Sequence, residues 1–198
     1  MNRISEDEVN DLTNFINQIL NNPVNLDNQK VNRLIFKDEI CEETVSPLLG
    51  WIESIEPEEE AKLYFSSNGG VCGISGVVWE AINSVDNLEL CLIESIESAA
   101  VDIVLNFEGK ISLGPYFLGG MIHKLDNQLS SKELNSSIPS VSKIMAGQYK
   151  IFDDISIDLY KGFFTKKQLD DYRKGLDVYF DRKHMESIVK KLNKRNGY

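Results

Sequence analysis

Histidine and cysteine are scarce in this chain, and their placement argues against several kinds of site. The 198 residues include two histidines and three cysteines, Cys41, Cys72 and Cys91. The cysteines form no Cys-x-x-Cys motif and have no histidine beside them. Such spacing speaks against a disulfide framework and against a zinc site. We therefore expect free thiols in a reducing compartment, and chemistry that uses neither a metal nor a cofactor.

The chain also lacks an excess of positive charge and a long apolar run. Its formal net charge is -10 at pH 7. Nucleic acid and an anionic membrane surface would both repel such a protein. No apolar run approaches the length that spans a bilayer, and the sequence does not open with a signal peptide. We expect a cytoplasmic protein that binds neither nucleic acid nor membranes.

The sequence does contain a serine at a sharp change of pattern. The apolar run 90–93 passes into polar residues, and apolar residues with helical spacing follow Ser98. Ser98 should therefore lie where a buried strand passes into a buried helix. The first turn of that helix leaves backbone N–H groups unpaired, and these can hold an anion. The hydroxyl is placed either to act as a nucleophile or only to cap the helix.

Two further stretches have related patterns. Residues 62–65 read as a strand that runs into the pair Gly69-Gly70, and a helical pattern follows. A glycine pair at such a turn leaves backbone amides uncovered. Further along, His123 ends the short apolar run that begins at Gly119.

Serine, glycine pair and histidine, in this order and at these separations, resemble the proteolytic subunit of the Clp protease (ClpP). That subunit belongs to a wider fold family with the crotonases and signal-peptide peptidase A. The resemblance runs from about Asn32 to about Asp181. It includes Arg33-Leu34-Ile35-Phe36 near its start and Gly175-Leu176-Asp177 near its end.

The residues predict an α/β fold, because strand and helix patterns alternate and the strands are continuous apolar runs. The resemblance implies ClpP/crotonase-like repeated β-β-α units, with a mostly parallel sheet flanked by helices. We expect an N-terminal amphipathic helix and loop (1–30), a ClpP-like α/β domain (31–181) and a basic C-terminal helix or tail (182–198). We expect the basic side chains of this last segment, and its His184, in solvent. Around Ser130 a helix start is predicted, for a helix shorter than its counterpart in the family.

The resemblance implies the site of a serine peptidase. Ser98 would be the nucleophile and His123 the general base that takes its proton. The oxyanion hole would be formed by Gly69, Gly70 and Ala99.

The acid that would orient the histidine is assigned with alternatives. Asp158 lies nearest to the position that the family's acid holds ahead of Phe163-Phe164-Thr165. Asp153 and Asp154 are the other candidates.

Three functions remain open at this stage. The leading one is a Clp-type serine peptidase that hydrolyses peptide bonds through an acyl-enzyme at Ser98. Glu97 stands where the family has a small residue, and Glu94 and Asp102 add carboxylates nearby. Because negative charge destabilises a developing oxyanion, a non-catalytic oligomeric ClpP-like protein is the second possibility. A crotonase-type acyl-CoA enzyme, with Glu94 or Glu97 as its base, is the third.

The partners follow from the resemblance. It implies a peptide or unfolded protein as substrate and association with further copies of the chain. It also implies an ATPase unfoldase, although the N-terminal segment has no counterpart of the family's short pore-lining loop.

Overall fold

A six-stranded sheet forms the centre of the protein, in the order β1-β2-β3-β5-β6 with β4 also paired to β3. The computed structural model describes residues 31–124 and 139–198, so the predicted N-terminal helix and the helix start near Ser130 lie outside the described residues. The strands and helices are β1 (Asn32–Phe36), α2 (Glu42–Glu53), β2 (Ala61–Ser67), α3 (Cys72–Asn83), β3 (Leu88–Glu97), α4 (Ala99–Asn106), β4 (Lys110–Leu113), β5 (Gly119–Ile122), α6 (Pro139–Tyr160), α7 (Lys166–Arg173), β6 (Val178–Asp181) and α8 (Arg182–Asn196).

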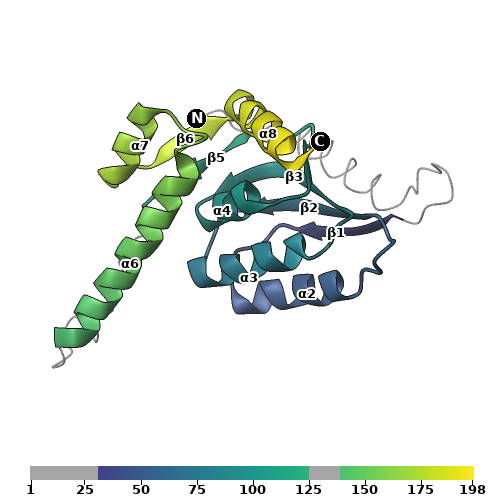
Figure 1. The fold of residues 1–198 in the computed structure, drawn as a ribbon, viewed down its shortest axis with the longest axis horizontal. Coiled ribbons are helices and arrows are strands. Elements are labelled where there is room, and N and C mark those ends of the chain that lie inside the picture. The colour runs from purple at the N-terminus through teal and green to yellow at the C-terminus, as the bar shows by residue number, and fades with distance from the viewer. Residues whose placement is uncertain (1–30, 125–138) are drawn as a thin grey trace, which may run out of the picture. The chain divides into compact units, whose positions relative to one another are not determined.

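Every strand pairing is parallel except the one between β5 and β6. Helices α2, α3 and α4 each connect one parallel strand to the next, and they lie side by side on one face of the sheet (Figure 1). Successive crossovers in one direction place their helices on the same face because each crossover is right-handed. The expected α/β class, with a mostly parallel sheet flanked by helices, is confirmed.

Strand β3 organises the sheet. Its side chains Leu90, Leu92 and Ile96 are fully buried. The first part of β3 pairs with β4 and its last part pairs with β5, with Glu97 opposite Met121. Parallel strands end at the same edge of a sheet, so the segments that follow β2, β3 and β5 meet there. These segments carry the glycine pair, the serine and the histidine.

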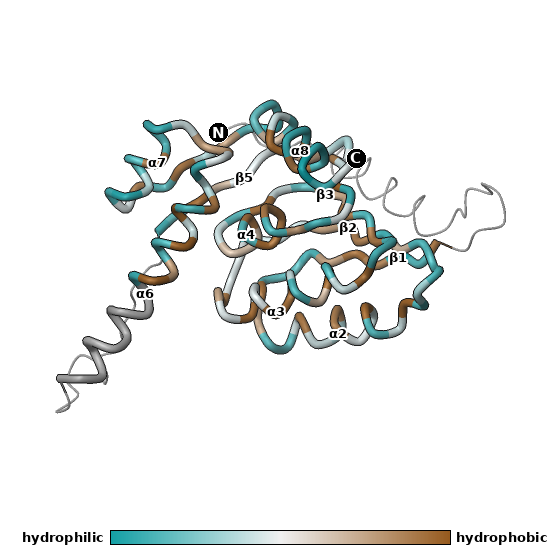
Figure 2. The backbone as a smooth tube through the Cα atoms, in the orientation of Figure 1, coloured by the Kyte–Doolittle hydropathy of each residue, from teal (hydrophilic) through white to brown (hydrophobic). Residues whose placement is uncertain are grey.

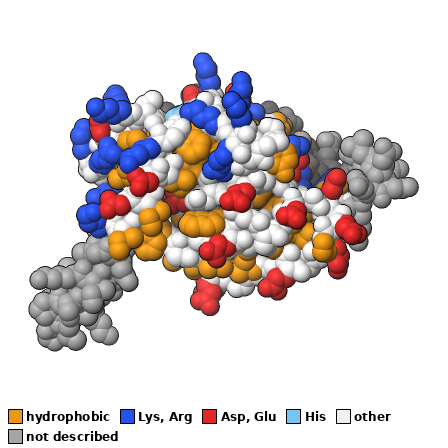
Figure 3. Space-filling model, viewed as in Figure 1, with side chains coloured by type: hydrophobic (Ala, Val, Ile, Leu, Met, Phe, Trp, Pro, Cys, Tyr) orange, Lys and Arg blue, Asp and Glu red, His pale blue; other side chains and the backbone are white. Residues whose placement is uncertain are grey.

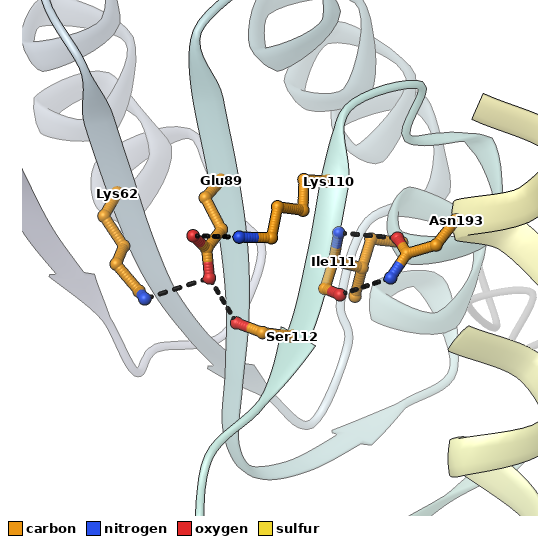
Figure 4. A network of polar contacts seen from close by, with 6 residues as sticks. All are labelled: Lys62, Glu89, Lys110, Ile111, Ser112 and Asn193. Carbon is orange, nitrogen blue, oxygen red and sulfur yellow. Dashed lines mark hydrogen bonds and ion pairs between the residues drawn. The ribbon is translucent and has the colours of Figure 1, made fainter. Parts of the chain in front are cut away.

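At the opposite end of the central strands, near their first residues, the sheet carries a network of charges, shown in Figure 4. The carboxylate of Glu89 on β3 accepts hydrogen bonds from Lys62 on β2 at 2.9 Å and from Ser112 on β4 at 2.6 Å. Lys110 lies 3.3 Å from its other oxygen. The network joins three neighbouring strands near their start, and it is separated from Ser98 by most of the length of β3.

Helix α8 is part of the packed domain, although most of its basic side chains are exposed as expected: Lys183, Lys190, Lys191, Lys194 and Arg195 are exposed, and Arg182 is partly buried. Met185, Ile188 and Leu192 are buried beneath it. Arg195 donates to the carbonyls of Leu105 and Phe107 at the end of α4, at 3.0 and 2.8 Å. The guanidinium thus satisfies carbonyls that the last turn of α4 leaves without helical partners.

His184 is also packed rather than free in solvent. Its ring lies against Phe164 and Phe180, with centroids 5.3 and 5.9 Å apart, and its Nε2 is 3.0 Å from the carbonyl oxygen of Phe163. The backbone in Figure 2 is mostly hydrophobic along α4 and mostly hydrophilic along α7 and α8. Figure 3 shows Lys and Arg gathered over α7 and α8.

Helix α6 runs from Pro139 to Tyr160. Ile151, Phe152 and Ile155 on it are exposed, whereas Asp153 and Tyr160 are buried. None of the helices in the described residues combines the length and the apolar character needed to cross a bilayer.

Candidate active site

Ser98 forms a sharp elbow between β3 and α4. Its φ of 53° and ψ of -128° make it the one described residue other than glycine with positive φ. Its N–H donates to the carbonyl of Met121 on β5 at 2.8 Å, which fixes the elbow against the neighbouring strand. A serine in this conformation is strained, and such strain gathers at functional sites. Although Ser98 precedes the helix, its side chain does not cap it.

The Ser98 hydroxyl is bonded to His123 instead. The distance from His123 Nε2 to Ser98 Oγ is 2.8 Å, within the range of a strong hydrogen bond. His123 follows β5, and this strand lies very close to its neighbours at Gly120. A Cβ at Gly120 would lie 2.1 Å from the carbonyl oxygen of Ile96. A glycine there therefore lets β5 approach β3 closely enough for histidine and serine to meet.

The turn after β2 contacts the elbow through its backbone. A Cβ at Gly69 would lie 2.6 Å from Cβ of Ser98 and 2.7 Å from the carbonyl oxygen of Glu97, so this position admits only glycine. Both glycines have positive φ, of 93° and 146°. Ser67 fixes the turn, since its Oγ accepts from the N–H of Gly69 at 3.1 Å.

The N–H of Gly70 faces the elbow. Ile40, which follows β1, donates to the carbonyl of Gly69 at 2.7 Å and accepts from Val71 at 2.8 Å. In parallel pairing, the residue between two such partners directs its own N–H to the opposite side. Since β2 lies between β1 and β3, that side is the one on which Ser98 lies.

A second N–H is available at the start of α4. Ala99 is the first residue of this helix, where backbone N–H groups lack intrahelical acceptors. Its N–H has no acceptor among the described residues. Gly70, in the turn after β2, and Ala99, at the start of α4, are thus the candidates for the two backbone donors that acyl transfer requires.

The assignment of Asp158 as orienting acid is wrong. Asp158 is exposed and pairs with Lys161, which directly follows the end of α6, so its carboxylate faces solvent and not His123. Asp154 is likewise exposed and pairs with Lys150 at 2.6 Å. Asp154 and Asp158 lie one helical turn apart on α6, so they share the side of the helix that faces solvent.

Asp153 is the buried candidate. It is 8% exposed, and its Oδ2 lies 3.3 Å from Nζ of Lys124, the residue after His123. Its Oδ1 accepts from the hydroxyl of Tyr172 at 3.4 Å. Within the described residues, no carboxylate is hydrogen-bonded to the His123 ring. The carboxylate of Asp153 is therefore bonded to Lys124 and Tyr172.

The two glutamates near the elbow differ in their surroundings. Glu94 forms an ion pair with Lys37. Glu97, directly before the serine, is partly buried and has no hydrogen-bond or ion-pair partner among the described residues. An unneutralised carboxylate therefore stands next to the serine.

Asp102, on the first turns of α4, has a partner that the sequence did not reveal. Its Oδ1 accepts from the hydroxyl of Tyr160 at 2.6 Å. Burial raises the pKa of Asp102 to about 6, although the hydrogen bond from Tyr160 lowers it in part. The one available signal was an aspartate among the otherwise apolar residues 99–105, a position that calls for a polar partner.

The described residues contain no group of three or more His, Cys, Asp or Glu side chains placed to hold a metal ion. What this region of the structure offers is a serine bonded to a histidine, with Gly70 and Ala99 as candidate backbone donors.

Comparison with known proteins supports the fold alone. No protein-family model and no curated protein matches the sequence. Among solved structures, the chain is similar to a point mutant of ClpP1 from Listeria monocytogenes. The TM-score is 0.55 at 16% identity, and the alignment covers 79% of this chain and 86% of that one. The protein therefore has a ClpP-like fold.

Proposed function

We propose that the protein is a serine hydrolase of the Clp type, which cleaves peptide bonds through an acyl-enzyme at Ser98. The observation that carries this proposal is the 2.8 Å contact between Ser98 Oγ and His123 Nε2 at a strained elbow. A nucleophile within hydrogen-bonding reach of a base is the geometric requirement for such chemistry.

The reaction follows from the geometry. His123 accepts the hydroxyl proton on Nε2 while Ser98 Oγ attacks the carbonyl carbon of the substrate. For this, the neutral imidazole carries its own proton on Nδ1. The N–H groups of Gly70 and Ala99 donate to the oxyanion that forms. Its collapse breaks the C–N bond, and the proton on Nε2 passes to the leaving amine. Water, deprotonated by the same histidine, then releases the acyl group.

No acidic partner of His123 lies among the described residues, and the lack of one affects the rate more than the reaction type. An orienting acid holds the imidazole in its tautomer and stabilises the imidazolium, and the other groups still catalyse without it. We propose that Ser98 and His123 act as a dyad, while the buried carboxylate of Asp153 is held by Lys124 and Tyr172.

A fluorophosphonate probe followed by mass spectrometry of the labelled peptide tests the proposal. We expect covalent labelling at Ser98, abolished by Ser98→Ala and strongly slowed by His123→Gln. Ser95→Ala is the matched control, because Ser95 lies shortly before Ser98 on strand β3 and its replacement should leave the labelling unchanged. Labelling that persists in Ser98→Ala would contradict the assignment of the nucleophile. A folded wild type that does not label would contradict the proposed activity.

The non-catalytic alternative has one observation in its favour. Glu97 places an unpaired carboxylate beside the serine, and negative charge opposes an oxyanion there. If wild type and Glu97→Ala both fail to label while they remain folded, this alternative replaces the first. The acyl-CoA alternative is less favoured, because Glu94 is paired with Lys37 and the serine is already bonded to a histidine, which leaves Glu97 as the one candidate base for that chemistry.

The partners belong to the same proposal. We infer that the protein associates with copies of itself and acts on peptides or unfolded proteins. The exposed apolar residues Ile151, Phe152 and Ile155 on α6 support self-association. An ATPase unfoldase partner and a cytoplasmic location remain predictions from the sequence.

A further inference from the structure

Helix α4 carries the candidate nucleophile at one end and a polar contact to α6 one turn later. Asp102 accepts from Tyr160 at 2.6 Å, and Tyr160 is 2% exposed. Tyr160 is the sole hydrogen-bond donor to this carboxylate among the described residues, and no described lysine or arginine pairs with it. Asp102 is partly buried, and a carboxylate with a single hydrogen-bond donor depends strongly on that donor.

The surface between α6 and α4 is otherwise imperfectly filled. A cavity of about 40 Å³ remains there, lined by Cys72 and Trp79 of α3, Asp102 of α4, and Phe152 and Leu159 of α6. Gaps of this kind lose contacts that would hold two helices together. The hydrogen bond between Asp102 and Tyr160 joins the two helices beside this gap.

A series of contacts also leads from Tyr160 to the residue that follows the histidine. The ring of Tyr160 packs edge-on against Tyr172 at 5.4 Å, and the hydroxyl of Tyr172 donates to Asp153 at 3.4 Å. Asp153 pairs with Lys124, next to His123, at 3.3 Å. Both members of the dyad are thus connected to the last turns of α6, the serine through Asp102 and the histidine through Lys124.

We propose that Asp102 and Tyr160 are positioning residues for the site, which hold α4 against α6 so that Ser98 and the N–H of Ala99 keep their places relative to His123. This inference rests on the proposed function. Neither side chain touches the substrate, and their effect passes through the seating of α4.

The charge of Asp102 gives the pair a measurable signature. Three titratable groups face it: Cys72 from α3, Tyr160 from α6 and Tyr172 from α7. Burial chiefly, and the charge of Asp102 next, raise the pKa of Cys72 to about 11. Burial and the charges of Asp153 and Asp102 also raise the pKa of Tyr172, so both groups stay neutral when Asp102 ionises. Asp102 is therefore the group of this cluster whose charge changes near neutral pH.

Removal of the Tyr160 hydroxyl should then lower the labelling rate more at high pH than at low pH. In Tyr160→Phe the ring remains, but an ionised Asp102 loses its donor. A protonated Asp102 is neutral and tolerates the loss. The test measures the rate constant of fluorophosphonate labelling between about pH 5 and about pH 8, a range that spans the Asp102 pKa of about 6. We expect the ratio of Tyr160→Phe to wild type to fall about tenfold across this range, the equivalent of one pKa unit.

Rescue distinguishes positioning from a general loss of packing. In an Asp102→Asn background the amide oxygen still accepts a hydrogen bond and no charge is buried. There, Tyr160→Phe should lower the rate much less, and by the same factor at every pH. Tyr179→Phe, at an exposed position on β6, is the control for the chemical change itself. A pH-independent loss in Tyr160→Phe, without rescue by Asp102→Asn, would overturn the proposal, as would a wild-type rate for Tyr160→Phe at every pH.

A readout without the probe separates this inference from the proposed activity. Thermal unfolding of wild type, the two single variants and the double variant should show the same pattern, with Tyr160→Phe losing more Tm at the higher pH and Asp102→Asn removing that dependence. If wild type does not label but the unfolding pattern appears, the proposed activity fails while the link between the helices stands. If wild type labels and neither pattern appears, the inference fails alone.

Discussion

Ser98 carries a backbone conformation that its side chain opposes. At a φ of 53° and a ψ of -128°, a Cβ is crowded in a way that glycine avoids. The fold maintains this conformation because the N–H of Ser98 is held by Met121 and its hydroxyl by His123. The strain should therefore be visible in stability when the side chain is varied.

We expect Ser98→Gly to be more stable than Ser98→Ala by on the order of 1 kcal/mol, since glycine relieves the strain at the cost of a more flexible unfolded chain. Urea unfolding of the two variants measures this difference. The matched pair is Ser95→Gly and Ser95→Ala on strand β3, where the order should reverse because glycine weakens a regular strand. The same order at both positions would mean that the elbow is not strained.

Glu97 permits a second prediction at this scale. Replacing it with alanine should raise the rate of fluorophosphonate labelling roughly fivefold, because about 1 kcal/mol of repulsion between its carboxylate and the developing oxyanion is removed. The gain should shrink as salt is added. Glu94→Ala is the control, because Lys37 already neutralises that carboxylate. An unchanged rate at low salt would show that Glu97 is directed away from the pocket.

The residues that meet at the site differ in how far the sequence reveals them. Ser98, His123 and the glycine pair each follow a strand, and parallel strands deliver such segments to one edge of a sheet. Their order along the chain, each directly after a strand, therefore predicts that they meet. The acid depends instead on the rotation of α6, where Asp153 is buried while Asp154 and Asp158 are exposed. Packing sets that rotation, and a spacing taken from a family cannot supply it.

At the scale of the elements, α8 shows how a basic helix can belong to a core. Asn193 on α8 bonds to both backbone groups of Ile111, accepting from its N–H at 2.9 Å and donating to its carbonyl at 2.8 Å. Figure 4 shows this contact beside the charged network of the sheet. The amide satisfies the side of β4 that faces away from β3, as another strand would. Charge pattern alone predicted a solvated helix, because it does not show the apolar face that Met185, Ile188 and Leu192 bury beneath the exposed basic side chains.

Asn193→Ala should lower the free energy of unfolding by about 1 to 3 kcal/mol, because both backbone groups of Ile111 lose a partner. Chemical denaturation measures the loss. Lys190→Ala, at an exposed position of the same helix, should change stability little. Since Asn193 lies far along the sheet from Ser98, the folded variant should still label. Equal stability of the two variants would argue against this anchoring role.

At the scale of the molecule, Asp102 should make stability depend on pH. Its pKa is about 6 in the folded protein against 3.8 as the ordinary value, so the folded state holds its proton to higher pH than the unfolded state. The stability that this proton contributes is present below about pH 4 and is lost as the pH rises through about 6. Between these pH values, the free energy of unfolding of Asp102→Asn should therefore rise relative to that of wild type by on the order of 3 kcal/mol. Unfolding at a series of pH values measures the gain, and a constant difference between the two proteins would contradict it.

Self-association is the last prediction, and it concerns the exposed face of α6. Ile151 and Ile155 lie one turn apart and are 61% and 56% exposed, an arrangement that leaves apolar area to be covered. We expect sedimentation velocity to show a mass above that of a monomer at micromolar concentration. Because a charge on this face would oppose its burial, the combined change Ile151→Asp and Ile155→Asp should reduce that mass. Val77→Asp, at an exposed aliphatic position on α3, is the control for adding an acidic group. A monomeric wild type would contradict the prediction, and an assembly equally insensitive to all three substitutions would exclude α6 as its contact.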